Sequence, residues 1–170
     1  KQGKFVDPSI NEKNDNIALG NSLSNTVQVA ASLTAILNEG TFVKPYIIDS
    51  ISDYEGNVIE QFKTERKSVI SKKTADVMKK AMRAAVQSGT GYRANIASIE
   101  IGEKTGTSSY IPGSGGNGWF AGYYKQDEKY YILTVMVPEL GKLPEISEGY
   151  TGGNTAAVVF REIVKAINQE

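Results

Sequence analysis

Residues 104–107 read Lys-Thr-Gly-Thr, and residues 118–123 read Gly-Trp-Phe-Ala-Gly-Tyr. Both runs lie in segments rich in apolar and β-favouring residues, and the segments at 99–108, 118–124 and 129–137 predict three strands. The connections between them are glycine-rich or polar. Three consecutive strands joined in this way indicate an antiparallel meander, and this sheet decides the fold.

Segments on either side of the meander predict helices that cover it. Helical patterns begin after the capping candidates Asn25 or Thr26 and after Ser71, and they end near Gly40 and Gly89. Helices packed on an antiparallel β-sheet define an α+β fold. The predicted helices are at about 27–38, 72–87 and 155–168, and a predicted hairpin has strands at 46–52 and 58–62.

The composition limits the chemistry that the chain can perform. Its 170 residues are enough for one domain with a sizeable core, and 19 basic residues balance 19 acidic ones. Because the net charge is zero, we expect no nucleic-acid partner. The sequence has no cysteine and no histidine, which excludes disulfides, thiol nucleophiles, histidine triads and metal sites built on these residues. Acid–base chemistry must therefore use Lys, Tyr, Asp or Glu.

The Lys-Thr-Gly-Thr run has the composition of a ligand-binding strand. Glycine weakens a strand interior, so Gly106 indicates that a ligand approaches the backbone closely. Such a ligand could hydrogen-bond to the strand as an added strand does. Lys104 would supply positive charge, and the hydroxyls of Thr105 and Thr107 could bind a carboxylate. The alternative is a structural strand that happens to carry a glycine.

Three other patterns have simpler explanations. The glycine-rich run at 113–118 lacks the lysine and the helix of a phosphate-binding loop, so we interpret it as a hairpin loop. Residues 89–94 match a dinucleotide-binding pattern, but they follow a helix rather than a strand. The tyrosine pairs at 123–124 and 130–131 could stack nucleic-acid bases, but no basic groove accompanies them.

Several stretches, in order along the chain, resemble the transpeptidase domain of penicillin-binding proteins. The Lys-Thr-Gly-Thr run resembles that family's third active-site motif, and the segment at 118–123 resembles its next strand. The sequence departs from the family's pattern at residues 20–22, at Val27, where proline is frequent, and at Glu103, where glycine is common. The other resembling stretches are at 17–20, 26–30, 38–40, 44–45, 82–83, 88–91 and 152–157.

The resemblance implies that the chain is the C-terminal part of such a domain. The family's nucleophile motif, S-x-x-K, is absent because no serine here has a lysine three positions later. Ser9-Ile10-Asn11 matches the second motif, S-x-N, but it lies too close to the stretch at 17–20. We therefore expect residues 1–16 to be a loop or a chain edge. Residues 17–170 would be the C-terminal part of the domain, with both motifs upstream.

The resemblance also implies an activity. The family transfers an acyl group from a peptide ending in D-Ala-D-Ala, through a serine that β-lactams also acylate. The complete protein would be a serine-type D,D-transpeptidase of class B, and the isolated chain would be inactive. Lys104 would be catalytic through its charge, and Thr107 through a backbone N–H of the oxyanion hole. Lys104, Thr105, Gly106 and Thr107 would bind substrate, with no metal and no cofactor.

The expected partners follow from the same resemblance. They are stem peptides, β-lactams, and either the upstream part of the domain or a second copy, because a partial domain exposes apolar surface. The site would lie on the outer face of the bacterial cell membrane, with any anchor upstream. Two alternatives are a penicillin-binding sensor domain of a β-lactam receptor and a non-catalytic interaction module of the same fold. The stretches at 28–40 and 88–91 favour the transpeptidase over the sensor.

Overall fold

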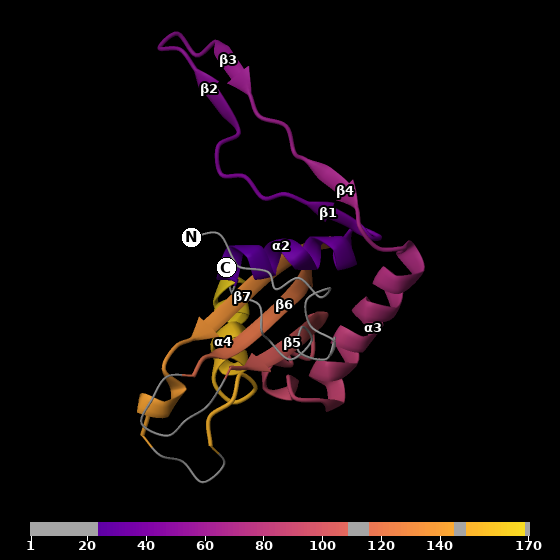
Figure 1. Ribbon diagram of the computed structural model, residues 1–170, viewed down its shortest axis with the longest axis vertical. Helices are drawn as coiled ribbons and strands as arrows, with labels where there is room; N and C mark the ends of the chain where they lie inside the picture. Colours follow the sequence, from indigo (N-terminus) through magenta and orange to yellow (C-terminus); the bar gives the residue numbers. More distant parts are fainter. Residues whose placement is uncertain (1–23, 109–115, 145–148, 169–170) are drawn as a thin grey trace, which may run out of the picture.

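A three-stranded antiparallel sheet lies at the centre of the molecule (Figure 1). The structure is a computed structural model that describes residues 24–108, 116–144 and 149–168. The strands are β5 (Ile101–Thr107), β6 (Gly118–Gln126) and β7 (Lys129–Val137), in the order β5-β6-β7. The predicted meander is therefore confirmed, and the Lys-Thr-Gly-Thr run lies on an outer strand.

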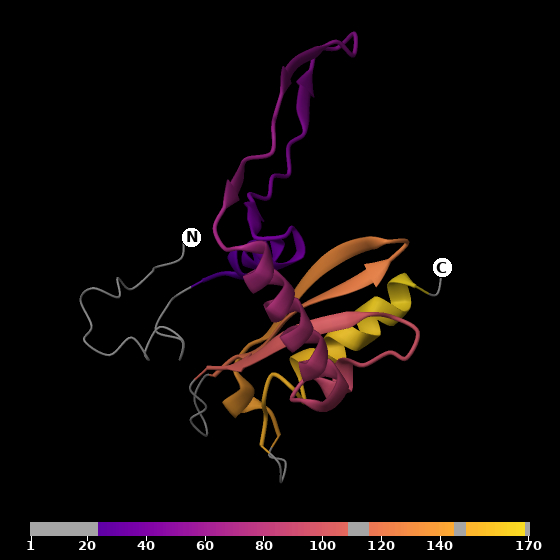
Figure 2. The same cartoon turned by 90° about the vertical axis from the view of Figure 1, so that its right-hand side faces the viewer.

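Three helices of the described part of the chain cover this sheet (Figure 2). α2 (Thr26–Leu37) and α4 (Ala156–Ile167) pack on opposite faces, and α3 (Lys72–Ser88) runs beside β5. The α+β class is confirmed, and the helix ends agree with the predicted ones to within one residue or two. On the α4 face, the core includes Phe120, Tyr124, Phe160 and Val164; on the α2 face, it includes Leu33, Met82, Ala121 and Tyr123.

Local sequence signals set the starts of α2 and α3. The Asn25 side chain accepts the N–H of Gln28 at 2.9 Å, and the Gln28 side chain accepts the N–H of Asn25 at 3.1 Å. This reciprocal capping box makes Asn25 the cap, rather than Thr26. Ser71 caps α3 by accepting the N–H of Thr74 at 3.1 Å, as its position predicted.

A two-stranded arm extends away from the sheet between α2 and α3 (Figure 1). Its base pairs β1 (Thr41–Val43) with β4 (Arg66–Ser68), and its outer part pairs β2 (Ser50–Ser52) with β3 (Val58–Gln61). The predicted hairpin is present, with shorter strands than expected. The sequence did not predict the base, because strands of three residues leave too short a pattern to recognise.

Two single turns of 3-10 helix complete the described structure. η2 (Tyr92–Ala94) follows α3, and η3 (Leu140–Lys142) follows β7. None of the helices in the described ranges is both long enough and apolar enough to cross a bilayer. Outside the described residues lie the predicted edge at 1–16 with its Ser9-Ile10-Asn11 match, the stretch at 17–20, and residues 113–115 of the predicted loop at 113–118.

Candidate active site

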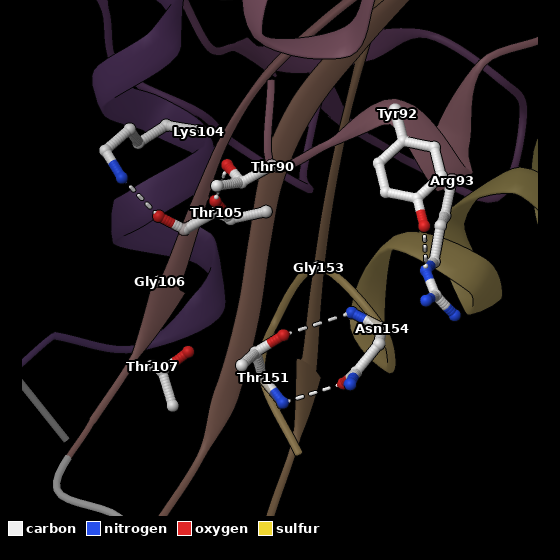
Figure 3. A pocket seen from close by; sticks show the side chains of 10 residues that line it. All are labelled: Thr90, Tyr92, Arg93, Lys104, Thr105, Gly106, Thr107, Thr151, Gly153 and Asn154. Atoms are coloured by element: carbon white, nitrogen blue, oxygen red, sulfur yellow. Dashed lines mark hydrogen bonds between the residues drawn. The ribbon is translucent and has the colours of Figure 1, made fainter. Parts of the chain in front are cut away.

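A pocket of about 540 Å³ lies beside the second half of β5 (Figure 3). The four residues singled out from the sequence line one side of it: Lys104, Thr105, Gly106 and Thr107. Two loops complete the lining, one between α3 and β5 and one before α4. They contribute Thr90, Tyr92 and Arg93, and Thr151, Gly153 and Asn154, respectively.

β5 is an outer strand, and one of its edges has no strand beside it among the described residues. Ser108 donates its N–H to the Asn117 carbonyl at 3.0 Å, at the end of the ladder between β5 and β6. Hydrogen-bonded pairs alternate along an antiparallel ladder, so even-numbered residues of β5 bond to β6. Thr105 and Thr107 therefore turn their backbone N–H and C=O groups toward the outer edge.

α3 covers only the first half of that edge. The Arg83 guanidinium on α3 donates to the Ile101 carbonyl at 2.9 Å, which satisfies an outward-facing acceptor. The second half, at Thr105 and Thr107, borders the pocket instead. A ligand in the pocket can therefore reach outward-facing backbone groups of β5, as strand addition requires.

Lys104 and Arg93 give the pocket positive charge, and no Asp or Glu is among the described residues that line it. The Lys104 side chain is exposed, and its ammonium donates to the Thr105 carbonyl at 2.5 Å. No group of described acidic residues could hold a metal ion. The electrostatics of the pocket favour an anionic ligand such as a carboxylate.

The two threonine hydroxyls of β5 are held by the two loops. Oγ1 of Thr105 lies 2.6 Å from Oγ1 of Thr90, and Oγ1 of Thr107 accepts the N–H of Gly152 at 3.2 Å. Because a hydroxyl that accepts one hydrogen bond keeps its own proton, Thr107 can still donate to a ligand. The loops thus hold both hydroxyl oxygens in place, and Thr107 can still donate a hydrogen bond to a ligand.

Gly106 and Gly152 are glycines for different reasons. A Cβ built on Gly106 would meet only Cβ of Trp119, at an ordinary 3.4 Å, so the packing of the fold tolerates a side chain there. A Cβ on Gly152 would lie 2.4 Å from the Gly106 carbonyl oxygen and 2.3 Å from that of Trp119. Gly152 is therefore needed for close packing, whereas Gly106 keeps space clear over the strand.

Sequence reasoning did not single out the loop residues as site residues. In the loop before α4, Asn154 accepts the N–H of Thr151 at 2.7 Å (Figure 3). Asn154 also donates to the Gly149 carbonyl at 2.7 Å, and both bonds shape that side of the pocket. Thr90 lies between Gly89 and Gly91, and Thr151 precedes a glycine pair. The sequence signal that could have identified these site residues is a polar residue next to a glycine, because glycine permits a close approach of the backbone.

Glu103, next to Lys104 on β5, is buried, with 1% of its surface exposed. Neither carboxyl oxygen has a hydrogen-bond partner among the described residues. Burial raises the pKa of Glu103 to about 7, and the charge of Lys104 opposes this rise. Near neutral pH, protonated and ionised forms of Glu103 are therefore both populated.

Comparison with known proteins identifies the family of the chain. Residues 2–165 match the family described as "Penicillin binding protein transpeptidase domain". Penicillin-binding protein 2a of Streptococcus pneumoniae is 31% identical over 158 residues, which cover 89% of this chain and 20% of that protein. The chain therefore spans about a fifth of the length of this relative.

Solved structures share the fold. The D,D-transpeptidase domain of a peptidoglycan glycosyltransferase from Eggerthella lenta superposes with a TM-score of 0.68 at 25% identity, over 88% of this chain and 33% of that one. Penicillin-binding protein 3 of Mycobacterium tuberculosis, complexed with ampicillin, superposes with a TM-score of 0.70 at 25% identity, over 88% of this chain and 35% of that one. The profile match along nearly the whole sequence, with this fold, shows that the chain belongs to the penicillin-binding protein transpeptidase family.

Proposed function

We propose that this chain forms one wall of the active site of a serine-type D,D-transpeptidase, which cross-links peptidoglycan stem peptides ending in D-Ala-D-Ala. One observation carries the proposal. No described strand pairs with the outer edge of β5 at Thr105 and Thr107, and beside it lies a pocket that offers Lys104, hydroxyl groups and no carboxylate among its described lining residues. A peptide that ends in a carboxylate matches each of these features.

In this proposal, the substrate lies along the edge of β5 in an extended conformation. Its backbone pairs with outward-facing groups of Thr105 and Thr107 in the manner of an added strand. The terminal carboxylate accepts hydrogen bonds from the threonine hydroxyls, and Lys104 and Arg93 provide the attracting charge. Gly106 leaves room for the substrate backbone.

The chemistry is acyl transfer through a covalent intermediate. A serine outside this chain attacks the penultimate carbonyl, D-Ala leaves, and an amine of another stem peptide takes the acyl group. The backbone N–H of Thr107 is one of two donors to the oxyanion, and Lys104 stabilises the charged groups of the site. Loss of one such donor costs about 2.7–4 kcal/mol of transition-state stabilisation. The same serine would be acylated by β-lactams.

The cellular setting is part of the same proposal. Peptidoglycan is assembled outside the cytoplasm, so the complete protein would act on the outer face of the bacterial cell membrane. We place it in class B. Its partners would be stem peptides, β-lactams, and the upstream part of its own domain.

The central experiment measures acylation of the complete protein by a fluorescent penicillin. Lys104→Ala should lower the acylation rate on the order of 100-fold, as expected when a preorganised electrostatic group is lost from an active site. Lys129→Ala is the matched control, because Lys129 is an exposed lysine at the start of β7, away from the pocket. An acylation rate for Lys104→Ala equal to that of the control would remove Lys104 from the site.

The isolated chain provides a second test. It has no S-x-x-K serine, so it should not be labelled covalently by the fluorescent penicillin. A labelled band that resists denaturation would contradict this. We also propose that the isolated chain associates with the upstream segment or with a second copy. Sedimentation equilibrium that finds only monomer at high micromolar concentration would contradict that association.

A further inference from the structure

Glu103 is the one charged residue buried in the described part of the chain, and the proposed chemistry does not use it. Its carboxyl group packs against the loop that joins α3 to η2. A Cβ built on Gly91 would lie 2.2 Å from Oε1 of Glu103 and 2.5 Å from its Cγ. The carboxyl therefore fills the space that a side chain at position 91 would occupy.

The same loop forms a wall of the pocket. Thr90 precedes Gly91, and its hydroxyl lies 2.6 Å from that of Thr105. The loop is tied to the end of α3 by the Gly91 N–H, which donates to the Ala85 carbonyl at 3.1 Å. On its β5 side, the side chain of Glu103 is in contact with Gly91.

We propose that Glu103 is a positioning residue: its buried carboxyl group supports the loop at Gly91 and thereby holds the Thr90 hydroxyl against Thr105 in the pocket wall. Its kinetic test rests on the function proposed above. Loss of this support would let the loop shift, and the Thr105 hydroxyl would lose the partner that fixes its position.

The surroundings of Glu103 make this support sensitive to protonation. Burial raises its pKa to about 7, although the positive charge of Lys104 favours ionisation. Because neither oxygen has a partner among the described residues, an ionised carboxylate would be driven toward water. Other ionisable side chains on the elements around it include Arg83 on α3, Tyr92 and Arg93 on η2, and Tyr123 and Tyr124 on β6.

The sign of the pH effect follows from this shift. The folded protein holds the Glu103 proton more tightly than the unfolded chain, so its contribution to stability falls as the pH rises from about 4.5 to about 7. Above that range, the ionised form predominates and the support of the loop weakens. The rate of acylation should then decline because Glu103 is ionised.

The kinetic test compares the wild-type complete protein with Glu103→Gln, which keeps the shape and removes the ionisation. The second-order rate constant of acylation by one penicillin is measured from about pH 5 to about pH 9. The ratio of wild type to Glu103→Gln should fall several-fold as the pH rises through about 7. Glu128→Gln, which removes a carboxylate that is 89% exposed in the β6–β7 turn, should follow the wild type. A ratio that does not change with pH would overturn the proposal.

A double-mutant cycle tests the contact without using activity. Gly91→Ala should strongly destabilise the wild type, because its Cβ collides with Glu103. The same substitution should cost much less in a Glu103→Gly background, where the collision is absent. Equal costs in both backgrounds would mean that the carboxyl does not support the loop. If the complete protein is not acylated at any pH, the proposed function fails, while this cycle still decides the contact.

Discussion

The arm and the central sheet are both antiparallel β-structure, yet they bury their side chains very differently. On the arm, Ile47 is 100% exposed and Tyr54 98%, whereas Phe120 and Tyr123 in the sheet are 0% exposed. The sheet has helices on both faces, and the arm has no covering layer among the described residues. The same backbone pattern thus gives a core only where other elements cover it.

Local contacts hold the arm together. At its tip, Oδ1 of Asp53 accepts the N–H groups of Glu55 and Asn57 at 2.9 and 2.8 Å, and the Asn57 side chain lowers the pKa of Asp53. Near its base, Lys44 and Glu65 form an exposed ion pair at 2.6 Å. Exposed pairs of this kind stabilise a protein by about 1 kcal/mol or less. The arm therefore depends on its turn and ladder rather than on buried side chains.

The largest effect should come from Gly152→Val. A side chain there would overlap the carbonyl oxygens of Gly106 and Trp119, so we expect a loss of about 4 kcal/mol or more of unfolding free energy. Gly56→Ala on the arm is the control: its φ of +87° disfavours alanine, but no atom lies within 4 Å of the new Cβ. Denaturant unfolding measures both. Equal losses would mean that the close packing at Gly152 is not a main determinant of stability.

Phe160→Ala should have the second-largest effect on stability. Phe160 is fully buried on α4, with its ring centroid 4.5 Å from that of Phe120. Removal of such a ring costs about 3–5 kcal/mol. Phe62→Ala on the arm, at 36% exposure, should cost about 1 kcal/mol or less. If thermal unfolding gave similar shifts in melting temperature for the two variants, the arm would have to be packed as tightly as the sheet.

Gly106→Val should affect stability little and binding much. The new Cβ meets only Trp119 at 3.4 Å, and β-branched residues suit strands, so the change in unfolding free energy should stay within about 1 kcal/mol. The valine side chain would, however, occupy the space over the strand where the substrate lies. Acylation by a fluorescent penicillin should fall sharply in the complete protein. Unchanged acylation would argue against a ligand on this strand.

Shortening of the arm should have the smallest effect. Replacement of residues 45–64 by Asn-Gly joins Lys44 and Glu65, which already share a backbone hydrogen bond of 3.0 Å, through a favoured hairpin turn. The melting temperature should change by no more than about 2 °C, and acylation should be unaffected. A loss of several degrees would show that the arm contributes to the core.

The central sheet could be predicted from the sequence because its signals are long and repeated. The segments of β6 and β7 each provide nine consecutive residues, and glycine or polar runs separate them. The caps at Asn25 and Ser71 could be recognised in the same way, because a polar residue precedes a periodic apolar stripe.

The rest of the site depends on contacts between distant parts of the chain. The burial of Glu103 requires the loop at Gly91, and the second wall of the pocket requires Thr151 and Asn154 to return beside β5. No local sequence pattern at these positions predicts that residues so far apart in the sequence lie side by side in the fold. Sequence reasoning therefore found one strand of the site, and the roles proposed for Lys104 and Thr107 stay predictions.

The half-covered edge of β5 sets a limit on the length of any bound peptide. Arg83 and α3 occupy the edge at Ile101, so within β5 the part of the edge that remains for pairing is near Thr105–Thr107, a span of roughly 10 Å. A peptide that enters along this edge meets the helix after about two or three residues. Under the proposed function, the free length of this edge would therefore limit how much of a peptide pairs with β5, in addition to the selection that charge provides.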